Sequence, residues 1–311
     1  MNSTPPKPHS LPMPPEASNS NVAQFCRRAA LFLTLGCGVL NLLGWLVVHT
    51  PLRIMLVGQE VWTQLARADG AAKANTLILG DSVAGQLYDA NNEIATGYWH
   101  LATNQAISLA GQELLLRRAL VHNPQIERVV LVLIPSAFGN DLDQPFTFNY
   151  FVKPFCDPFT WHQLSPVVRV RLARKWQLWA GLLPLVKGTQ LFSEVDYSLD
   201  PSNSALHEEQ DSARPASPRQ PFLSAVSADA LERMASLCRA NGIRFELRSG
   251  PLSPAWADFE SLRRSISAAK LSDLFSGYFE SIRVLPAELF SDTVHLRKDV
   301  LPEYRNNWLG L

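Results

Sequence analysis

A serine, an aspartate and a histidine in this 311-residue chain have the types and spacing that nucleophilic catalysis requires. Ser82 closes a Gly80-Asp81-Ser82 turn after a short apolar run, and Asp292 stands three residues before His295. A serine hydroxyl is barely nucleophilic at neutral pH unless a general base takes its proton. His295 is the candidate base, and Asp292 is the candidate carboxylate that orients its imidazole. The three residues together predict acyl-enzyme chemistry on an ester.

A tetrahedral intermediate formed on Ser82 would need N–H donors for its oxyanion. The candidates are the backbone N–H groups of Ser82 and Gly111 and the side-chain amide of Asn140. Ser108 lies in the same turn as Gly111 and is an alternative donor there. No metal or organic cofactor is required by this chemistry.

Strands and helices alternate over the part of the chain that carries these residues. Apolar runs predict strands at 75–79, 129–134, 243–247 and 282–285, a short strand and turn at 104–111, and helices at 112–122, 228–240, 256–269 and 298–308. Such alternation is typical of an α/β fold with a parallel sheet. Because parallel strands end along one edge of their sheet, residues far apart in sequence can meet there.

In these short segments the chain resembles the SGNH (GDSL-like) hydrolase superfamily. The resemblance covers about residues 75–305 and is carried by Gly80-Asp81-Ser82, the turn at 108–111, Asn140, and the Asp292–His295 pair. It implies a serine nucleophile, an Asp-His pair that completes the triad, and an oxyanion hole with a glycine N–H and an asparagine amide. It also implies a three-layer α/β/α sandwich around a parallel, flavodoxin-like five-stranded sheet.

The two middle blocks depart from the family pattern, because Gly139 and Asn140 have no residue between them and the turn at 108–111 is loose. Together with an N-terminal apolar helix, this pattern is similar to the membrane-anchored branch of the superfamily. That branch implies acylation of a cell-surface polysaccharide, alongside a membrane-bound acyltransferase. A non-catalytic relative that binds glycan or serves as a scaffold in such a complex is the alternative.

The N-terminal region predicts a membrane anchor. Arg27 and Arg28 precede residues 29–48, a run of 20 residues without a charge, which is long enough to cross a bilayer as a helix. The basic flank favours a cytoplasmic N-terminus, so the main domain would face the periplasm of a bacterial inner membrane or the cell exterior. A cleaved signal peptide and a core helix of a soluble intracellular enzyme are the alternatives.

These features divide the chain into segments. We expect a disordered cytoplasmic tail at 1–24, a transmembrane helix at 25–49, a linker helix at 50–74, and a hydrolase-like domain at 75–311 that includes an aromatic cap at 135–192 and a mobile insertion at 193–220. The aromatic stretch at 146–161 either walls an acyl or sugar site or packs the core of the cap.

Charge and cysteine content exclude other classes. Lys and Arg balance Asp and Glu at 28 each, which argues against a nucleic-acid partner. The four cysteines show no spacing typical of a zinc site. Cys156 and Cys238 either pair in an oxidising compartment or remain buried thiols.

Each candidate also has an ordinary structural explanation. Ser82 could cap a helix, and Asp292 could cap the last helix with His295 left in solvent. Asn140 could be a turn residue, and Gly111 could mark a helix entry.

Overall fold

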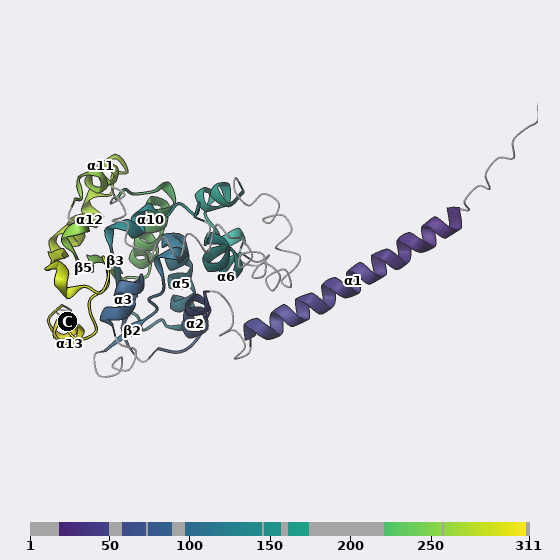
Figure 1. The fold of residues 1–311 in the computed structure, drawn as a ribbon, viewed down its shortest axis with the longest axis horizontal. Helices are drawn as coiled ribbons and strands as arrows, with labels where there is room; N and C mark the ends of the chain where they lie inside the picture. The colour runs from purple at the N-terminus through teal and green to yellow at the C-terminus, as the bar shows by residue number, and fades with distance from the viewer. Residues whose placement is uncertain are drawn as a thin grey trace, which may run out of the picture.

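The computed structural model describes residues 19–49, 58–72, 74–88, 97–144, 146–156, 161–173, 221–256 and 258–308. The insertion expected at 193–220 and most of the tail expected at 1–24 lie outside the described residues. The described chain forms an α/β fold with one long N-terminal helix that stands apart from the remaining elements (Figure 1).

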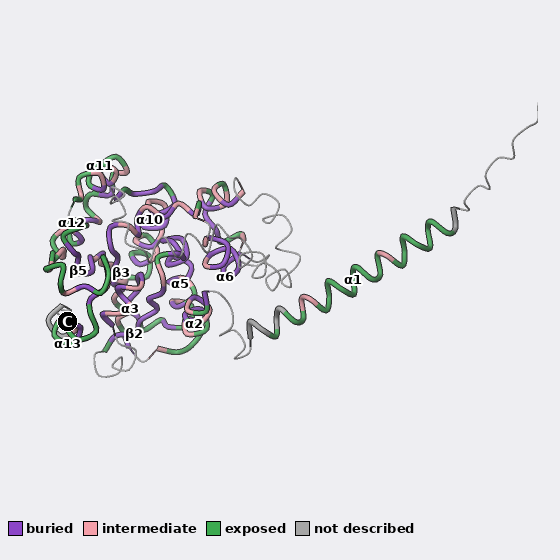
Figure 2. The backbone as a smooth tube through the Cα atoms, in the orientation of Figure 1, coloured by how far each residue is buried: buried purple, intermediate pink, exposed green. Residues whose placement is uncertain are grey.

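Helix α1 (Asn19–His49) begins six residues earlier than the segment expected at 25–49. Most of the described residues of α1 are exposed (Figure 2). Among its apolar side chains, Phe25, Phe32 and Leu33 are between 69% and 73% exposed. Within the described residues α1 is the one helix long and apolar enough to cross a membrane. An uncovered apolar helix of this length is consistent with a signal anchor or a signal sequence.

The sheet has four parallel strands in the order β2-β1-β3-β4. Its strands are β1 (Thr76–Gly80), β2 (Tyr98–His100), β3 (Arg128–Leu133) and β4 (Arg244–Ser249). The strands predicted at 75–79, 129–134 and 243–247 are confirmed with shifts of one or two residues. Strand β2 was not predicted, because three residues are too few to show a periodic pattern.

The expected fifth strand does not join this sheet. Residues 282–285 contain β6 (Arg283–Val284), which pairs with β5 (Pro251–Leu252) in a separate two-stranded sheet. Both residues of β6 are exposed, and the strand is only two residues long, so it adds little to the buried core. The parallel sheet of the described residues therefore has four strands where five were expected.

The helices follow the strands along the chain. They include α2 (Gln59–Ala68), α3 (Ser82–Leu87), α5 (Ser108–His122), α10 (Ala225–Ala240), α11 (Glu260–Ala268), α12 (Ser272–Ser281) and α13 (Leu301–Trp308). The strand expected within 104–111 is wrong: these residues form the 3₁₀ turn η3 (Gln105–Ile107) and the first turn of α5. Local hydrogen bonding by Asn104, which caps η3 through Ala106 N–H, explains the difference.

The aromatic segment packs into the protein core. It contains the short helices η4 (Pro135–Gly139), η5 (Phe148–Val152), α6 (Lys153–Phe155) and η6 (Trp161–Gln163). Phe148, Phe151 and Phe155 are at most 3% exposed, which supports core packing for this stretch. Cys156 and Cys238 are buried free thiols, and burial raises the pKa of Cys238 to about 12.

Strand β1 lies at the point where the strand order reverses. The chain runs from β1 to β2 on one side and then crosses to β3 on the other. Leu77, Ile78 and Leu79 are fully buried, as expected for a central strand covered on both faces. In open α/β sheets, ligands bind beyond the carboxyl ends of the strands at such a reversal. The fold thus places Ser82, two residues after β1, at the edge of the sheet where such ligands bind.

Gly80 makes the exit from β1 possible. Its φ of +150° is rarely adopted by other residues, and a Cβ there would lie 2.1 Å from the Val132 carbonyl oxygen and 2.6 Å from Ala84 Cβ. Only a glycine lets the chain turn into α3 while it stays this close to β3.

We predict that Gly80→Ala lowers the free energy of unfolding by about 3 kcal/mol or more, because backbone strain and a clash with backbone atoms add together. Gly242→Ala is the matched control, since Gly242 also has a positive φ of 69° but has open space around it. The control should lose only about 1 kcal/mol. Urea denaturation in detergent micelles measures both, and equal losses would contradict the role given to the close approach.

Candidate active site

Ser82 is the first residue of α3 and does not cap the helix itself. Asp81 is the cap: its Oδ1 accepts hydrogen bonds from the N–H groups of Val83 at 2.9 Å and Ala84 at 3.4 Å. The Ser82 hydroxyl is therefore not used for capping and remains free to interact with other groups. The structure thus favours the chemical interpretation of Ser82 over the capping interpretation.

The second carboxylate oxygen of Asp81 connects the turn to the neighbouring strand. Oδ2 accepts a hydrogen bond of 3.0 Å from the N–H of Ile134, the residue after β3. Asp81 is only 1% exposed. Burial raises its pKa above the ordinary value, while the hydrogen bonds from Ile134, Val83 and Ala84 act in the opposite direction.

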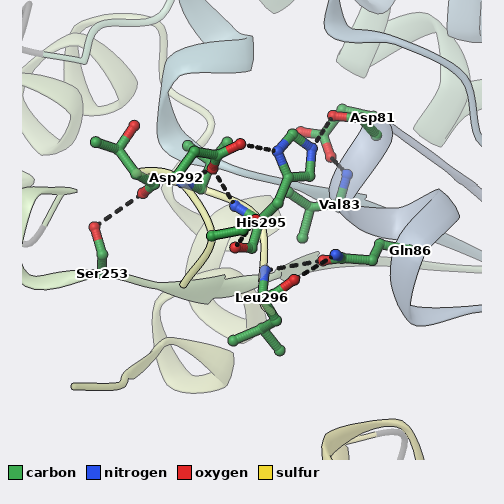
Figure 3. Close-up of polar contacts among 11 residues, drawn as sticks. Asp81, Val83, Gln86, Ser253, Asp292, His295 and Leu296 are labelled. Carbon is green, nitrogen blue, oxygen red and sulfur yellow. Dashed lines mark hydrogen bonds and ion pairs between the residues drawn. The ribbon is translucent and has the colours of Figure 1, made fainter. Parts of the chain in front are cut away.

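His295 lies against the start of α3, although 213 residues separate it from Ser82. Its Nε2 is 2.8 Å from Ser82 Oγ. Its Nδ1 is 2.8 Å from Asp292 Oδ2 (Figure 3). With the Nδ1 proton directed at the carboxylate, Nε2 accepts the hydrogen bond from the serine hydroxyl. The structure brings Ser82, His295 and Asp292 into one hydrogen-bonded line, as the sequence predicted.

The two carboxylate oxygens of Asp292 have different hydrogen-bond partners. Oδ1 accepts hydrogen bonds of 2.7 Å from the N–H groups of both Val294 and His295, which leaves Oδ2 for the imidazole. Burial acts to raise the pKa of Asp292, but these hydrogen bonds and the nearby His295 outweigh it and hold the pKa below its ordinary value. Asp292 is therefore held as a carboxylate, the form that orients an imidazole and stabilises an imidazolium.

Two side chains that the sequence analysis did not single out hold the loop with His295 in place. The Ser253 hydroxyl donates to the Thr293 carbonyl oxygen at 2.9 Å, and Gln86 bonds the backbone of Leu296. The only sequence signal for Gln86 is its place four residues after Ser82, which puts both on one side of a helix. No local pattern could have indicated its partner, 210 residues away.

The first candidate oxyanion donor is the backbone N–H of Ser82. Within the first turn of α3, the N–H groups of Val83, Ala84 and Gly85 are bonded to Asp81, which leaves that of Ser82 without a partner among the described residues. Because it lies at the positive end of a helix beside the nucleophile, the Ser82 N–H can stabilise an oxyanion.

Helix α5 starts close to the turn that holds Ser82. The side chain of Gln112 donates to the Gly80 carbonyl oxygen at 2.7 Å. Ser108, the first residue of α5, has the uncommon dihedrals φ 59° and ψ 171° and accepts a hydrogen bond from Ala110 N–H. Gly111 lies four residues into the helix, where a Cβ would be 2.3 Å from Ile107 Cγ1. The glycine at 111 is thus explained by packing, and its oxyanion role stays a prediction.

Asn140 is part of the loop structure that follows β3. Its amide donates to the Gln105 carbonyl oxygen at 3.0 Å, and its Oδ1 accepts from Leu142 N–H at 3.0 Å. The neighbouring Asp141 accepts a hydrogen bond from Val226 N–H at the start of α10. The amide of Asn140 is therefore engaged with η3 through at least one of its two hydrogens, and its oxyanion role stays a prediction.

Comparisons of the chain with models of known protein families, with curated proteins and with solved structures found no match in any of the three. Fold and geometry therefore define the class: an α/β protein with a parallel four-stranded sheet and a hydrogen-bonded serine–histidine–aspartate line at the carboxyl end of β1. Within the described residues, no group of three or more His, Cys, Asp or Glu side chains is arranged to hold a metal ion.

The lowered pKa of Asp292 predicts a pH-dependent contribution to stability. When folding lowers the pKa of a carboxyl group, the group stabilises the fold at any pH above its pKa in the unfolded protein. This stabilisation is lost as the pH falls through its pKa in the folded protein. Asp292→Asn keeps an acceptor for the Val294 and His295 N–H groups but removes the charge. We expect wild type to exceed this variant in free energy of unfolding at pH 5, with the difference shrinking below about pH 4. Urea titrations at several pH values measure it, and a difference that stays constant down to pH 2 would contradict the assignment.

Proposed function

We propose that the chain is a membrane-anchored, extracytoplasmic serine esterase or O-acyltransferase of SGNH type that acts on acyl esters. The observation that carries this proposal is the line from Ser82 Oγ through the His295 ring to Asp292 Oδ2, with both distances at 2.8 Å. A nucleophile within hydrogen-bond reach of a base, and a base oriented by a third group, is the recognised signature of covalent acyl transfer.

Each group has one role in the proposed reaction. Ser82 Oγ attacks the ester carbonyl while His295 Nε2 takes the hydroxyl proton, and the Ser82 N–H stabilises the oxyanion. The tetrahedral intermediate collapses to an acyl-serine, and His295 returns the proton to the departing alcohol. Water or a sugar hydroxyl then attacks the acyl-serine, with His295 again taking and returning a proton. Asp292 holds the imidazole and stabilises its protonated form throughout.

The strand order supports an SGNH-type fold. With the right-handed crossovers that parallel strands almost always use, the order β2-β1-β3-β4 would put α3 on one face of the sheet and α5 and α10 on the other. This is the three-layer arrangement of that superfamily. We propose that the four-stranded sheet is a reduced form of the five-stranded flavodoxin-like sheet, with β5 and β6 standing apart from it.

The exposure of the site fits a large substrate. The side chains of Asp292 and His295 are 53% and 30% exposed, so the base side of the site is open to solvent. An open site on a membrane-tethered domain can accept an acyl ester on a bulky carrier, and a cell-surface polysaccharide is the substrate class we propose. A membrane-bound acyltransferase is the proposed partner, with α1 as the anchor in the inner membrane.

We predict that the full-length protein in detergent reacts covalently with a fluorophosphonate probe at Ser82. Ser82→Ala should abolish labelling. His295→Ala should slow it at least about a hundredfold, because general-base assistance is worth that much or more. In-gel fluorescence over time measures the rates, and mass spectrometry of the labelled peptide identifies the residue.

Ser276→Ala is a suitable control, since Ser276 is an exposed helical serine whose hydroxyl donates to the carbonyl oxygen of Asp273, three residues earlier in the same helix. Its labelling rate should equal that of wild type. A wild type that remains unlabelled at millimolar probe would contradict the catalytic proposal.

A non-catalytic function, as a glycan-binding or scaffold protein of a membrane acylation complex, is favoured by one observation. The amide of Asn140, which the family resemblance assigns to the oxyanion hole, is bonded to the Gln105 carbonyl oxygen. The same probe distinguishes the two functions, because a scaffold has no need of a reactive serine.

The proposed location makes a separate prediction. Arg27 and Arg28, which precede the uncharged run at 29–48 within α1, favour a cytoplasmic N-terminus, so the C-terminus should lie outside the cytoplasm. A C-terminal fusion to a reporter that needs an oxidising compartment should therefore be active in bacterial cells. Replacing both arginines with glutamate is the control that should weaken this orientation, and an inactive reporter on the unaltered protein would overturn it.

A further inference from the structure

Helix α3 and the loop with His295 are connected at two neighbouring places. Ser82 and Gln86 lie one turn apart on α3, and His295 and Leu296 are consecutive on the loop. The first connection is the 2.8 Å contact from Ser82 to His295, and the second joins Gln86 to Leu296. Side chains four residues apart on a helix are neighbours, so the two connections run side by side.

The second connection uses both polar ends of one carboxamide. Gln86 Nε2 donates to the Leu296 carbonyl oxygen at 2.7 Å, and Gln86 Oε1 accepts from the Leu296 N–H at 3.0 Å (Figure 3). The side chain thus pairs with the backbone as a neighbouring strand would, in a geometry that fixes both position and direction. The Leu296 side chain is only 1% exposed, which anchors the same residue in the core.

A third contact ties the chain beyond the loop to the same helix. Arg305 of α13 donates from Nε at 3.1 Å and from Nη2 at 2.9 Å to the backbone carbonyl oxygen of Gln86. This carbonyl lies in the last turn of α3, where no intrahelical donor remains for it. The backbone of Gln86 thus binds α13, while its side chain binds the loop.

The loop needs such a tether because it has little regular structure of its own. Residues 291–295 form bends, and the isolated bridge between Phe290 and Leu296 closes them. Displacing a catalytic group by about 1 Å can cost about a hundredfold in rate. A reciprocal pair of hydrogen bonds next to His295 restricts the movement that would matter most.

We propose that Gln86 is a positioning residue that holds the general base His295 at the nucleophile. This inference rests on the proposed function, since a base is needed only if Ser82 reacts. Gln86 itself contacts neither the imidazole nor the serine hydroxyl through any observed hydrogen bond, so it acts through the backbone of Leu296.

The test measures the rate at which the fluorophosphonate probe labels full-length protein. Gln86→Ala should lower this rate ten- to a hundredfold. The matched control is Gln125→Ala, because exposed Gln125 also donates to a backbone carbonyl oxygen, that of Ala72, but lies at the other end of the sheet. The control should stay within twofold of wild type.

A double-mutant cycle separates positioning from general damage to the fold. If Gln86 acts through His295, then Gln86→Ala should have no further effect on labelling once His295 is replaced by Ala. An equal loss in both backgrounds would show a merely structural role and overturn the inference. An unlabelled wild type would instead refute the proposed function, so the two failures are distinguishable.

A second variant, Gln86→Glu, tests the proposal in case Gln86→Ala does not fold. Glutamate keeps the size and the acceptor for Leu296 N–H, but places an oxygen against the Leu296 carbonyl oxygen in place of the donor. It should fold, as judged by thermal unfolding, and still label at least tenfold more slowly than wild type. Labelling of a folded Gln86→Glu variant at the wild-type rate would contradict the proposal.

Discussion

The buried carboxylate of Asp81 connects the start of helix α3 to the end of strand β3 by hydrogen bonds. One oxygen binds the first turn of α3 and the other binds the backbone beyond β3, so the turn after β1 is held on two sides. Removing this carboxylate would leave buried N–H groups without acceptors, and each such group would lower the free energy of unfolding by about 1–3 kcal/mol. The position of Ser82 depends on this interaction, because the Asp81 carboxylate fixes the turn immediately before it and caps the helix that Ser82 begins.

The opposite side of the site is organised by contacts to backbone atoms. Asp292 holds the N–H groups of its own loop, Ser253 holds the Thr293 carbonyl oxygen, and Gln86 holds Leu296. These bonds constrain main-chain positions, so the imidazole of His295 can be placed without a deep pocket around it. The result is an ordered line of three side chains in a site that remains open to solvent.

The sequence alone determined the parts of this protein that local chemistry controls. The apolar runs predicted β1, β3 and β4, the uncharged N-terminal run predicted α1, and the types and order of Ser82, Asp292 and His295 indicated a nucleophile, an orienting carboxylate and a base. These predictions rest on burial of apolar runs and on the limited number of side chains that can do such chemistry, and both are properties of short segments.

Only the tertiary structure decided the remaining features, since they depend on pairing between distant segments. A three-residue strand such as β2 is defined by its neighbour, and residues 283–284 form a two-residue strand whose partner is β5. The engagement of the Asn140 amide with η3, and the pairing of Gln86 with Leu296, join residues 35 and 210 positions apart. A hydrogen bond across such a separation leaves no local pattern in the chain, because the geometry that selects the partner exists only after the sheet has formed.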